Sequence, residues 1–282
     1  MSANVNTSIK DNTIQTVDPV WRAVCKEAEA VVQSEPMLAT FIYSTILNQT
    51  GLEGAVIHRI AERMHNREVN ADVIRRSFEE MNAHDQQWSE MLRSDIAAVY
   101  DRDPACERLI EPILYFKGFH AIQTHRLAHW NWHNGHKDFA LYLQSRSSQV
   151  FQTDINPRAK IGRGLFLDHA TGFVVGETAV IGDDCSILHG VTLGGTGKEG
   201  SDRHPKIGDG VLIGAGATVL GNIKIGQCSR VAAGSMVIKE VENNVTVAGV
   251  PAKVVGVAGC CVWRVHRQPL AGDHVEPCHL AS

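Results

Sequence analysis

The sequence predicts an α+β protein in which an all-α N-terminal domain is followed by a parallel β-helix. Two patterns indicate this. Apolar side chains recur at helical spacing from residue 18 to about residue 152, and an aliphatic residue returns at every sixth position from Ile155 to Val241. A period of six fits neither a helix nor an ordinary strand and is typical of hexapeptide β-helix repeats. Three repeats would close one triangular coil of about 18 residues, and stacked coils would bury a continuous aliphatic ladder.

Composition restricts the function classes. The chain has 282 residues, enough for about two domains, and a net charge of −4 that argues against a nucleic-acid partner. No apolar stretch is long enough for a membrane span, and the first twenty residues lack the apolar core of a secretory signal, so we expect a cytoplasmic protein. Seven scattered cysteines form no metal-type pair. We expect reduced thiols, with Cys185 and Cys228 as small packing residues of the coils.

The helical region has recognisable start signals. Residues 1–17 are polar and aperiodic, which predicts a disordered tail. Asp18-Pro19 combines a capping residue with a proline suited to a first helical turn, and Asp103-Pro104 and Glu111-Pro112 are similar signals. Further helices are predicted near 36–51, over 56–64, as a pair between 70 and 100, and over 116–132. We place the helical domain at 18–152, the β-helix at 153–258 and a C-terminal tail at 259–282.

Two features of the helical domain have competing interpretations. Asp95 follows Trp88 by seven residues and therefore projects from an apolar stripe, where a carboxylate is costly unless it is paired or faces an opening. From spacing alone, pairing with a neighbouring base is the simpler interpretation. The histidines at 129, 133 and 136 lack a carboxylate or cysteine to complete a ligand set, so we predict no metal site there.

The six-residue repeat is interrupted twice. The step from Leu167 to Val175 is eight residues, and the step from Leu193 to Ile207 is fourteen. Ionisable residues are concentrated in these interruptions. This pattern favours a function carried by loops that leave a rigid scaffold. The first contains Asp168-His169-Ala170-Thr171-Gly172, and the second contains Gly194-Gly195-Thr196-Gly197-Lys198 and Asp202-Arg203-His204-Pro205.

These motifs, with the helical domain, Tyr115-Phe116-Lys117-Gly118-Phe119-His120 and Ala248-Gly249-Val250-Pro251-Ala252, closely resemble the serine acetyltransferase family over residues 18 to about 257. The resemblance implies a left-handed β-helix, an exception to the usual crossover preference. It also implies transfer of acetyl from the co-substrate acetyl-CoA to the hydroxyl of L-serine. The product would be O-acetylserine for cysteine synthesis, and no metal or bound cofactor would be required.

The resemblance also assigns roles to individual residues. His169 would be the general base and Asp154 its partner, which the coil length allows because the two are fifteen residues apart. A serine hydroxyl attacks poorly until its proton is removed, and histidine has a suitable pKa for that task. A carboxylate on the far ring nitrogen would fix the tautomer. The serine ammonium would contact Asp95 and Asp168, the carboxylate side would contact Arg203 and His204, and the CoA groove would be lined by Gly195, Thr196, Ala215, Ala233, Gly234 and Lys253.

The resemblance further implies an assembly and its ligands. Trimers, paired into a hexamer by the helical domain, would share the CoA groove between neighbours, and L-cysteine would inhibit by occupying the serine site. Relatives commonly end in an isoleucine that enters O-acetylserine sulfhydrylase, whereas this chain ends His279-Leu280-Ala281-Ser282. Losing a large apolar anchor forfeits roughly 1.5 to 3 kcal/mol, so we expect no stable complex with that enzyme.

Three alternatives stay open at this point. The chain could acetylate another hydroxyl acceptor, such as homoserine or a sugar. It could be a zinc hydratase on the same β-helix, which would need three converging histidines, for which His169, His189 and His204 have no recognisable spacing. It could also be a non-catalytic scaffold, although that predicts no clustered ionisable residues at the interruptions.

Overall fold

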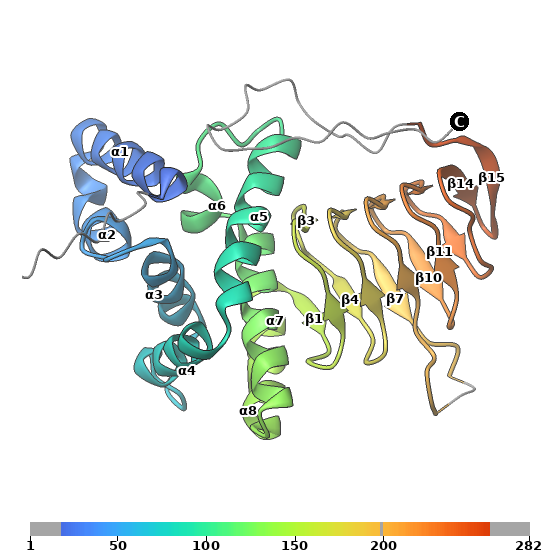
Figure 1. Ribbon diagram of the computed structural model, residues 1–282, viewed down its shortest axis with the longest axis horizontal. Coiled ribbons are helices and arrows are strands. Elements are labelled where there is room, and N and C mark those ends of the chain that lie inside the picture. The colour runs from blue at the N-terminus through green and yellow to red at the C-terminus, as the bar shows by residue number, and fades with distance from the viewer. Residues whose placement is uncertain (1–17, 198–199, 260–282) are drawn as a thin grey trace, which may run out of the picture.

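The computed structural model describes residues 18–197 and 200–259 of the chain. The predicted tail at 1–17 and all but the first residue of the one at 259–282 lie outside these ranges. Helices extend as far as Phe151 and strands follow from Thr153. Figure 1 shows the helices gathered at one end of a stack of short strands. The predicted combination of an all-α N-terminal domain and a parallel β-helix is therefore confirmed.

The helical domain starts as its sequence signal predicts. The Asp18 side chain accepts a hydrogen bond from the Val20 amide at 3.0 Å, and Pro19 is the first helical residue. The predicted pair of helices between 70 and 100 is present, whereas Asp103-Pro104 starts no helix because Asp103 caps the end of the preceding one. The elements are α1 (Pro19–Ser34), the 3-10 turn η1 (Pro36–Leu38), α2 (Ala39–Ile42), the π-helical η2 (Tyr43–Leu47), α3 (Leu52–Met64), α4 (Ala71–His84), α5 (Gln86–Arg102), α6 (Ile110–Leu114), α7 (Lys117–His133) and α8 (Lys137–Phe151).

None of the helices within the described ranges combines the length and the apolar character that crossing a bilayer would require. Most of the long ones have one buried face, as in α4, where Ile74, Phe78 and Met81 lie inside. The exception is α7, which is buried along most of its length. A helix covered on nearly all sides is the natural centre of a small helical domain.

The strands form three sheets in which most strands pair in parallel with the one three places further along the chain. Val174 pairs with Thr192, 18 residues later, which is the predicted coil length. Sheet 1 contains β1 (Thr153–Ile155), β4 (Phe173–Val175), β7 (Thr192–Gly194), β10 (Thr218–Leu220) and β13 (Met236–Val237). Sheet 2 contains β2 (Lys160–Ile161), β5 (Val180–Ile181), β8 (Lys206–Ile207) and β11 (Lys224–Ile225). Sheet 3 contains β3 (Phe166–Leu167), β6 (Ser186–Ile187), β9 (Leu212–Ile213), β12 (Arg230–Val231), β14 (Val245–Gly249) and the antiparallel β15 (Ala252–Val257).

The six-residue period has a direct structural cause. Ile187, Ile213 and Val231 lie in register on successive coils of sheet 3, and all three are fully buried. Each coil contributes one such side chain per face, so the interior is a column of stacked aliphatic residues, with small polar side chains such as Ser229 and Ser235 buried beside it. The burial of this column provides the main stabilisation of the β-helix.

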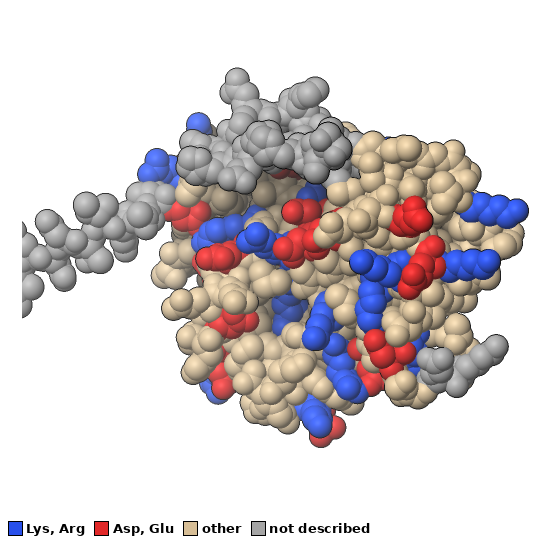
Figure 2. All heavy atoms as spheres, turned by 45° about the vertical axis from the view of Figure 1, so that its right-hand side comes forward, with Lys and Arg blue, Asp and Glu red and all other residues tan. Residues whose placement is uncertain are grey.

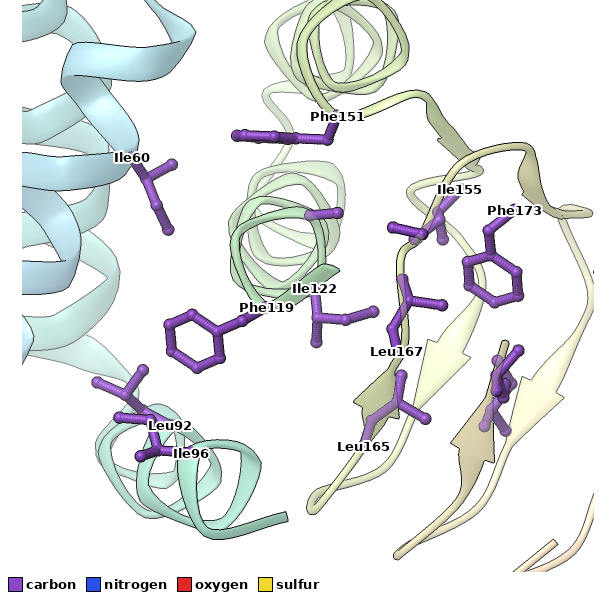
Figure 3. Close-up of a cluster of buried hydrophobic side chains, with 14 of the residues drawn as sticks. Ile60, Leu92, Ile96, Phe119, Ile122, Phe151, Ile155, Leu165, Leu167 and Phe173 are labelled. Carbon is purple, nitrogen blue, oxygen red and sulfur yellow. The ribbon is translucent and has the colours of Figure 1, made fainter. Parts of the chain in front are cut away.

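A single apolar core joins the two domains. Figure 3 shows Ile122 of α7 pointing toward Leu167 of the first coil, whereas the ring of Phe119 points the other way, toward Leu92 and Ile96 of α5. All of these side chains belong to one buried cluster. The approach is close, because a Cβ added to Gly118 would lie 2.0 Å from the Leu167 carbonyl oxygen. The start of α7 is thus fixed directly against the strand that leads into the first interruption.

The state of the cysteines differs in part from the expectation. Cys25, Cys106 and Cys185 carry free thiols, and Cys185 is fully buried among the coils as predicted. Cys228, however, is disulfide-bonded. The repeat pattern predicts a small side chain at that position, but it carries no information on the oxidation state.

Candidate active site

Two kinds of corner organise the ionisable residues of the β-helix. The His169 corner comprises the four connections from sheet 3 to sheet 1, namely β3–β4, β6–β7, β9–β10 and β12–β13. The Arg203 corner comprises those from sheet 1 to sheet 2, namely β1–β2, β4–β5, β7–β8 and β10–β11. The first interruption lies on the His169 corner and the second on the Arg203 corner. The two interruptions are therefore separated by the width of sheet 1.

The first interruption presents His169 to solvent on an unusual backbone. His169 and Ala170 have φ of 56° and 59°, in the left-handed region that residues with a Cβ rarely adopt. The Ala170 side chain is fully buried, whereas the His169 side chain is 72% exposed. Its Nε2 lies 3.5 Å from Asp168 Oδ2. The left-handed turn thus directs the His169 imidazole outward, away from the buried Ala170.

A cavity of about 390 Å³ opens beside this imidazole, between the first coil and the helical domain. Asp168 and His169 line it from the coil, and Asp103 and Lys117 line it from the helices, with Phe116 and Phe166 among the apolar walls. Burial raises the pKa of the Asp168 carboxyl, His169 opposes that shift and Asp103 adds to it. Two carboxylates facing one cavity make a site for a small cation such as an ammonium group.

Asp103 was missed by the sequence prediction, which interpreted Asp103-Pro104 only as a helix start. In the structure it follows the last turn of α5, where its Oδ1 accepts a hydrogen bond from the Ala105 amide at 2.8 Å. Only the packing of α5 against the coil, with Arg102 donating to the Gly164 carbonyl at 3.1 Å, brings it to the cavity. No local pattern in the sequence marks that contact.

Asp95 does not line this cavity, which corrects its predicted role as a contact for the serine ammonium. Its side chain is fully buried, and both carboxylate oxygens accept hydrogen bonds from Arg126. The Gln123 amide at 2.7 Å and the Leu165 backbone amide at 3.0 Å complete its partners. The interpretation from spacing alone, a carboxylate paired with a neighbouring base, is confirmed.

The second interruption holds Arg203 and His204 in a separate network. Arg203 Nη2 donates to Glu177 Oε2 at 2.6 Å, and Glu177 also pairs with Arg158. The His204 ring is mostly buried and its Nδ1 contacts the Thr178 hydroxyl at 2.9 Å. Burial, followed by the charge of Arg203, lowers the pKa of His204, so its imidazole is neutral near pH 7. Figure 2 shows acidic and basic side chains interspersed on the face it displays.

The remaining predicted residues are spread over the surface of the β-helix. Asp154 lies in β1, where its exposed carboxylate accepts from Gln144 Nε2 at 2.6 Å; no hydrogen bond joins it to His169 within the described part of the chain. Ala215, Ala233 and Gly234 follow β9 and β12 on the His169 corner. Gly195 and Thr196 follow β7 on the Arg203 corner, and Lys253 is exposed on β15. A single chain does not bring these residues together.

The histidines do not converge on a metal-type site. The His189 ring lies 5.7 Å from the His169 ring, one coil further along the same corner, whereas His204 belongs to the other corner. On α7 the His129 and His133 rings are 4.2 Å apart, and each Nδ1 contacts a backbone carbonyl. Over residues 18–197 and 200–259, no three histidine, cysteine or acidic side chains are grouped as metal ligands would be.

Comparison with known proteins gives a consistent result. Residues 20–124 match the model of the serine acetyltransferase N-terminal domain, and residues 204–239 match that of the bacterial transferase hexapeptide, six repeats. The serine acetyltransferase of Salmonella typhimurium strain LT2 is 49% identical over 87% of this chain and 90% of its own length. Serine acetyltransferase 4 of Arabidopsis thaliana is 50% identical over 87% of this chain and 69% of its own length.

Solved structures agree in fold and in family. The serine acetyltransferase of Brucella abortus strain S19, solved in complex with coenzyme A, has a TM-score of 0.86 and 64% identity, covering 86% of this chain and 98% of that one. A serine acetyltransferase in complex with cysteine has a TM-score of 0.83 and 48% identity, covering 84% of this chain and 98% of that one. The similarity spans both domains and both interruptions of the repeat, and the chain is an acyltransferase that belongs to the serine acetyltransferase family.

Proposed function

We propose that the chain transfers the acetyl group of acetyl-CoA to the hydroxyl of L-serine, with His169 as general base, to give O-acetylserine and CoA as the first step of cysteine synthesis. The observation that carries the proposal is the cavity in which His169 lies beside Asp168 and opposite Asp103. It offers a base and an ammonium site within one small space. Relatives solved with coenzyme A and with cysteine support the two ligand classes.

The chemical step is a direct transfer. One imidazole nitrogen of His169 removes the hydroxyl proton of serine as its oxygen attacks the thioester carbonyl, and the carbon–sulfur bond breaks as the tetrahedral intermediate collapses. The imidazolium then returns the proton to the departing CoA thiolate, so atoms and charge balance without any metal. The exposed imidazole suits this role because it has to meet both substrates.

The substrate is held through its charged groups. Asp103 and Asp168 bind the serine ammonium, so Asp103 takes the role first predicted for Asp95. Arg203 and His204 bind the carboxylate side. Asp154 gives up its present hydrogen bond with Gln144 and accepts one from His169 instead, which orients the imidazole. Backbone amides near Gly195 stabilise the oxyanion.

A second copy of the chain completes this site. Because the His169 and Arg203 corners lie on opposite edges of sheet 1, one chain cannot place Arg203 beside its own His169. In a trimer, the Arg203 corner of one chain lies against the His169 corner of the next, and the CoA groove forms between Ala215, Ala233 and Gly234 on one side and Gly195 on the other. The helical domains then pair two trimers into a hexamer. Sedimentation showing a monomer that retains full activity would contradict this assembly.

The substrate assignment is tested by thiol release from acetyl-CoA across a panel of acceptors. We expect serine to react far faster than homoserine or sugars, because only an α-amino acid of that length satisfies both anchors. L-Cysteine offers the same ammonium and carboxylate and is expected to compete with serine. Equal rates with homoserine or a sugar would show that the acceptor is another hydroxyl compound.

A further inference from the structure

The turn that carries His169 differs from every other connection of its corner. Each of the later connections contains one residue of positive φ, and it is a glycine: Gly190, Gly216 and Gly234. The first connection instead contains three such residues, of which His169 and Ala170 have a Cβ. A left-handed conformation costs such residues about 1 kcal/mol or more each, so this turn requires support from outside the coil.

Part of that support comes from the end of α8. Gln152, which terminates the helix in a left-handed conformation, accepts a hydrogen bond from the Gly172 amide at 2.8 Å through its backbone carbonyl. Its side-chain Oε1 also accepts from the Thr171 hydroxyl at 3.1 Å. The second coil contributes one further bond, from the Gly190 amide to the Thr171 carbonyl at 2.8 Å.

The start of α7 supplies the remaining contact. The Lys117 ammonium donates to Gln152 Oε1 at 2.8 Å and also to the Thr171 hydroxyl. Lys117 precedes Gly118, which lies directly against Leu167, so its backbone has little freedom to move relative to the coil. The three side chains form a closed set in which the lysine donates twice and Gln152 Oε1 accepts twice.

We propose that Lys117, with Gln152 and Thr171, is a positioning residue that ties the strained turn of His169 to the helical domain and so holds the imidazole in the geometry that the acetyl transfer requires. The proposal rests on the proposed function, because positioning matters to catalysis only if His169 is the base. Lys117 lines the cavity, yet its ammonium is already engaged by these two partners. The function of the helical domain then includes holding the catalytic turn, in addition to oligomer assembly.

Lys117→Met tests this positioning role, since it keeps an unbranched side chain one atom shorter and removes the hydrogen bonds to Gln152 and Thr171. We expect kcat to fall roughly tenfold to a hundredfold, the scale of a misplaced catalytic group, with KM for serine and for acetyl-CoA little changed. Thr171→Val should give a similar loss, Thr171→Ser should restore activity by keeping the hydroxyl, and the double variant Lys117→Met/Thr171→Val should be no worse than either single variant. Lys224→Met, an exposed lysine on β11, is the matched control and should match the wild type.

Hydrogen exchange gives a readout that does not depend on the chemistry. The amides of residues 170–172 should exchange faster in Lys117→Met and at the wild-type rate in Thr171→Ser. Activity retained in His169→Ala would refute the assignment of His169 as the general base. Unchanged hydrogen exchange and unchanged kcat in Lys117→Met would refute the positioning role of Lys117. A raised KM for serine with kcat intact would also overturn the proposal, because it would make Lys117 a substrate contact.

Discussion

The Asp95 carboxylate and the Arg126 guanidinium form a buried ion pair, with Oδ2 2.8 Å from Nη2 and 3.0 Å from Nε. The same guanidinium donates to the Gly162 carbonyl at 2.8 Å, and the same carboxylate accepts from the Leu165 amide. The pair therefore connects α5 and α7 to the first coil, which is a structural role.

Asp95→Asn should accordingly act on stability. Removing one partner leaves the Arg126 charge buried and unpaired, which typically costs about 3 to 5 kcal/mol. Urea unfolding followed by circular dichroism measures the loss. Asp72→Asn is the control, since Asp72 is an exposed partner of Arg75 and such surface pairs contribute about 1 kcal/mol or less. A stable Asp95→Asn protein with a raised KM for serine would instead support the ligand role first predicted for this residue.

The base assignment predicts that His169→Ala lowers kcat by roughly a hundredfold to ten-thousandfold, the range for a positioned general base. Asp154→Asn should cost less, because it only orients the ring. His189→Ala is a useful comparison, since it removes the neighbouring imidazole on the same corner and should cause a much smaller loss. Steady-state kinetics would decide, and near-normal turnover of His169→Ala would contradict the mechanism.

Replacing Asp103 by Asn should weaken serine binding. The change removes one of the two carboxylates facing the cavity while keeping the shape of the side chain, so KM for serine should rise and the free energy of unfolding should stay nearly constant. Inhibition by L-cysteine should weaken in parallel, because both amino acids present the same ammonium. Arg203→Ala should show the same pattern through the carboxylate. If Asp103→Asn left both constants unchanged, the ammonium site would have to lie elsewhere.

Gly118→Ala should destabilise the junction of the two domains, although alanine is the better helix former. The new Cβ would meet the Leu167 carbonyl, and relieving such overpacking usually costs about 1 to 3 kcal/mol or more. Gly54→Ala in α3 is the matched control, because its Cβ would approach only the Gln49 side chain, at 3.4 Å. Helix propensity should then stabilise that variant by roughly 0.5 to 1 kcal/mol. Thermal or urea unfolding of both variants tests the contrast.

Acid should destabilise the helical domain through two buried histidines. Burial is the main reason that the pKa of His120 and of His125 falls to about 3, so both remain neutral when folded and protonate near pH 6.5 when unfolded. Their contribution is present above pH 6.5 and is lost as the pH falls toward 3, by up to about 2 kcal/mol per histidine between pH 7 and pH 5.

Unfolding free energies at pH 7 and pH 5 would measure this loss. His125→Phe should reduce the pH dependence of the unfolding free energy by the contribution of about one bound proton. The control variant is His65→Gln, which replaces an exposed histidine. An unchanged slope in His125→Phe would contradict the argument.

The sequence by itself determined the β-helix. Each face of a coil places one aliphatic side chain in the interior, and this requirement produces the six-residue period in the sequence. It also marked the two interruptions of the period, where Asp168, His169, Arg203 and His204 stand. The helices α4 and α5 followed from their apolar stripes. These features depend on residues near one another in the chain.

Only the tertiary structure decided which carboxylate reaches the cavity. Asp95 lies on α5 and Asp103 at its end, and either carboxylate could have faced the cavity. Asp95 is buried in an ion pair with Arg126, which comes from a different helix, whereas Asp103 lies at the end of α5 and lines the cavity together with Asp168. The separation of His169 from Arg203 has a similar origin, because corner membership depends on how the coils close. Such long-range contacts between elements leave no periodic signal in the sequence.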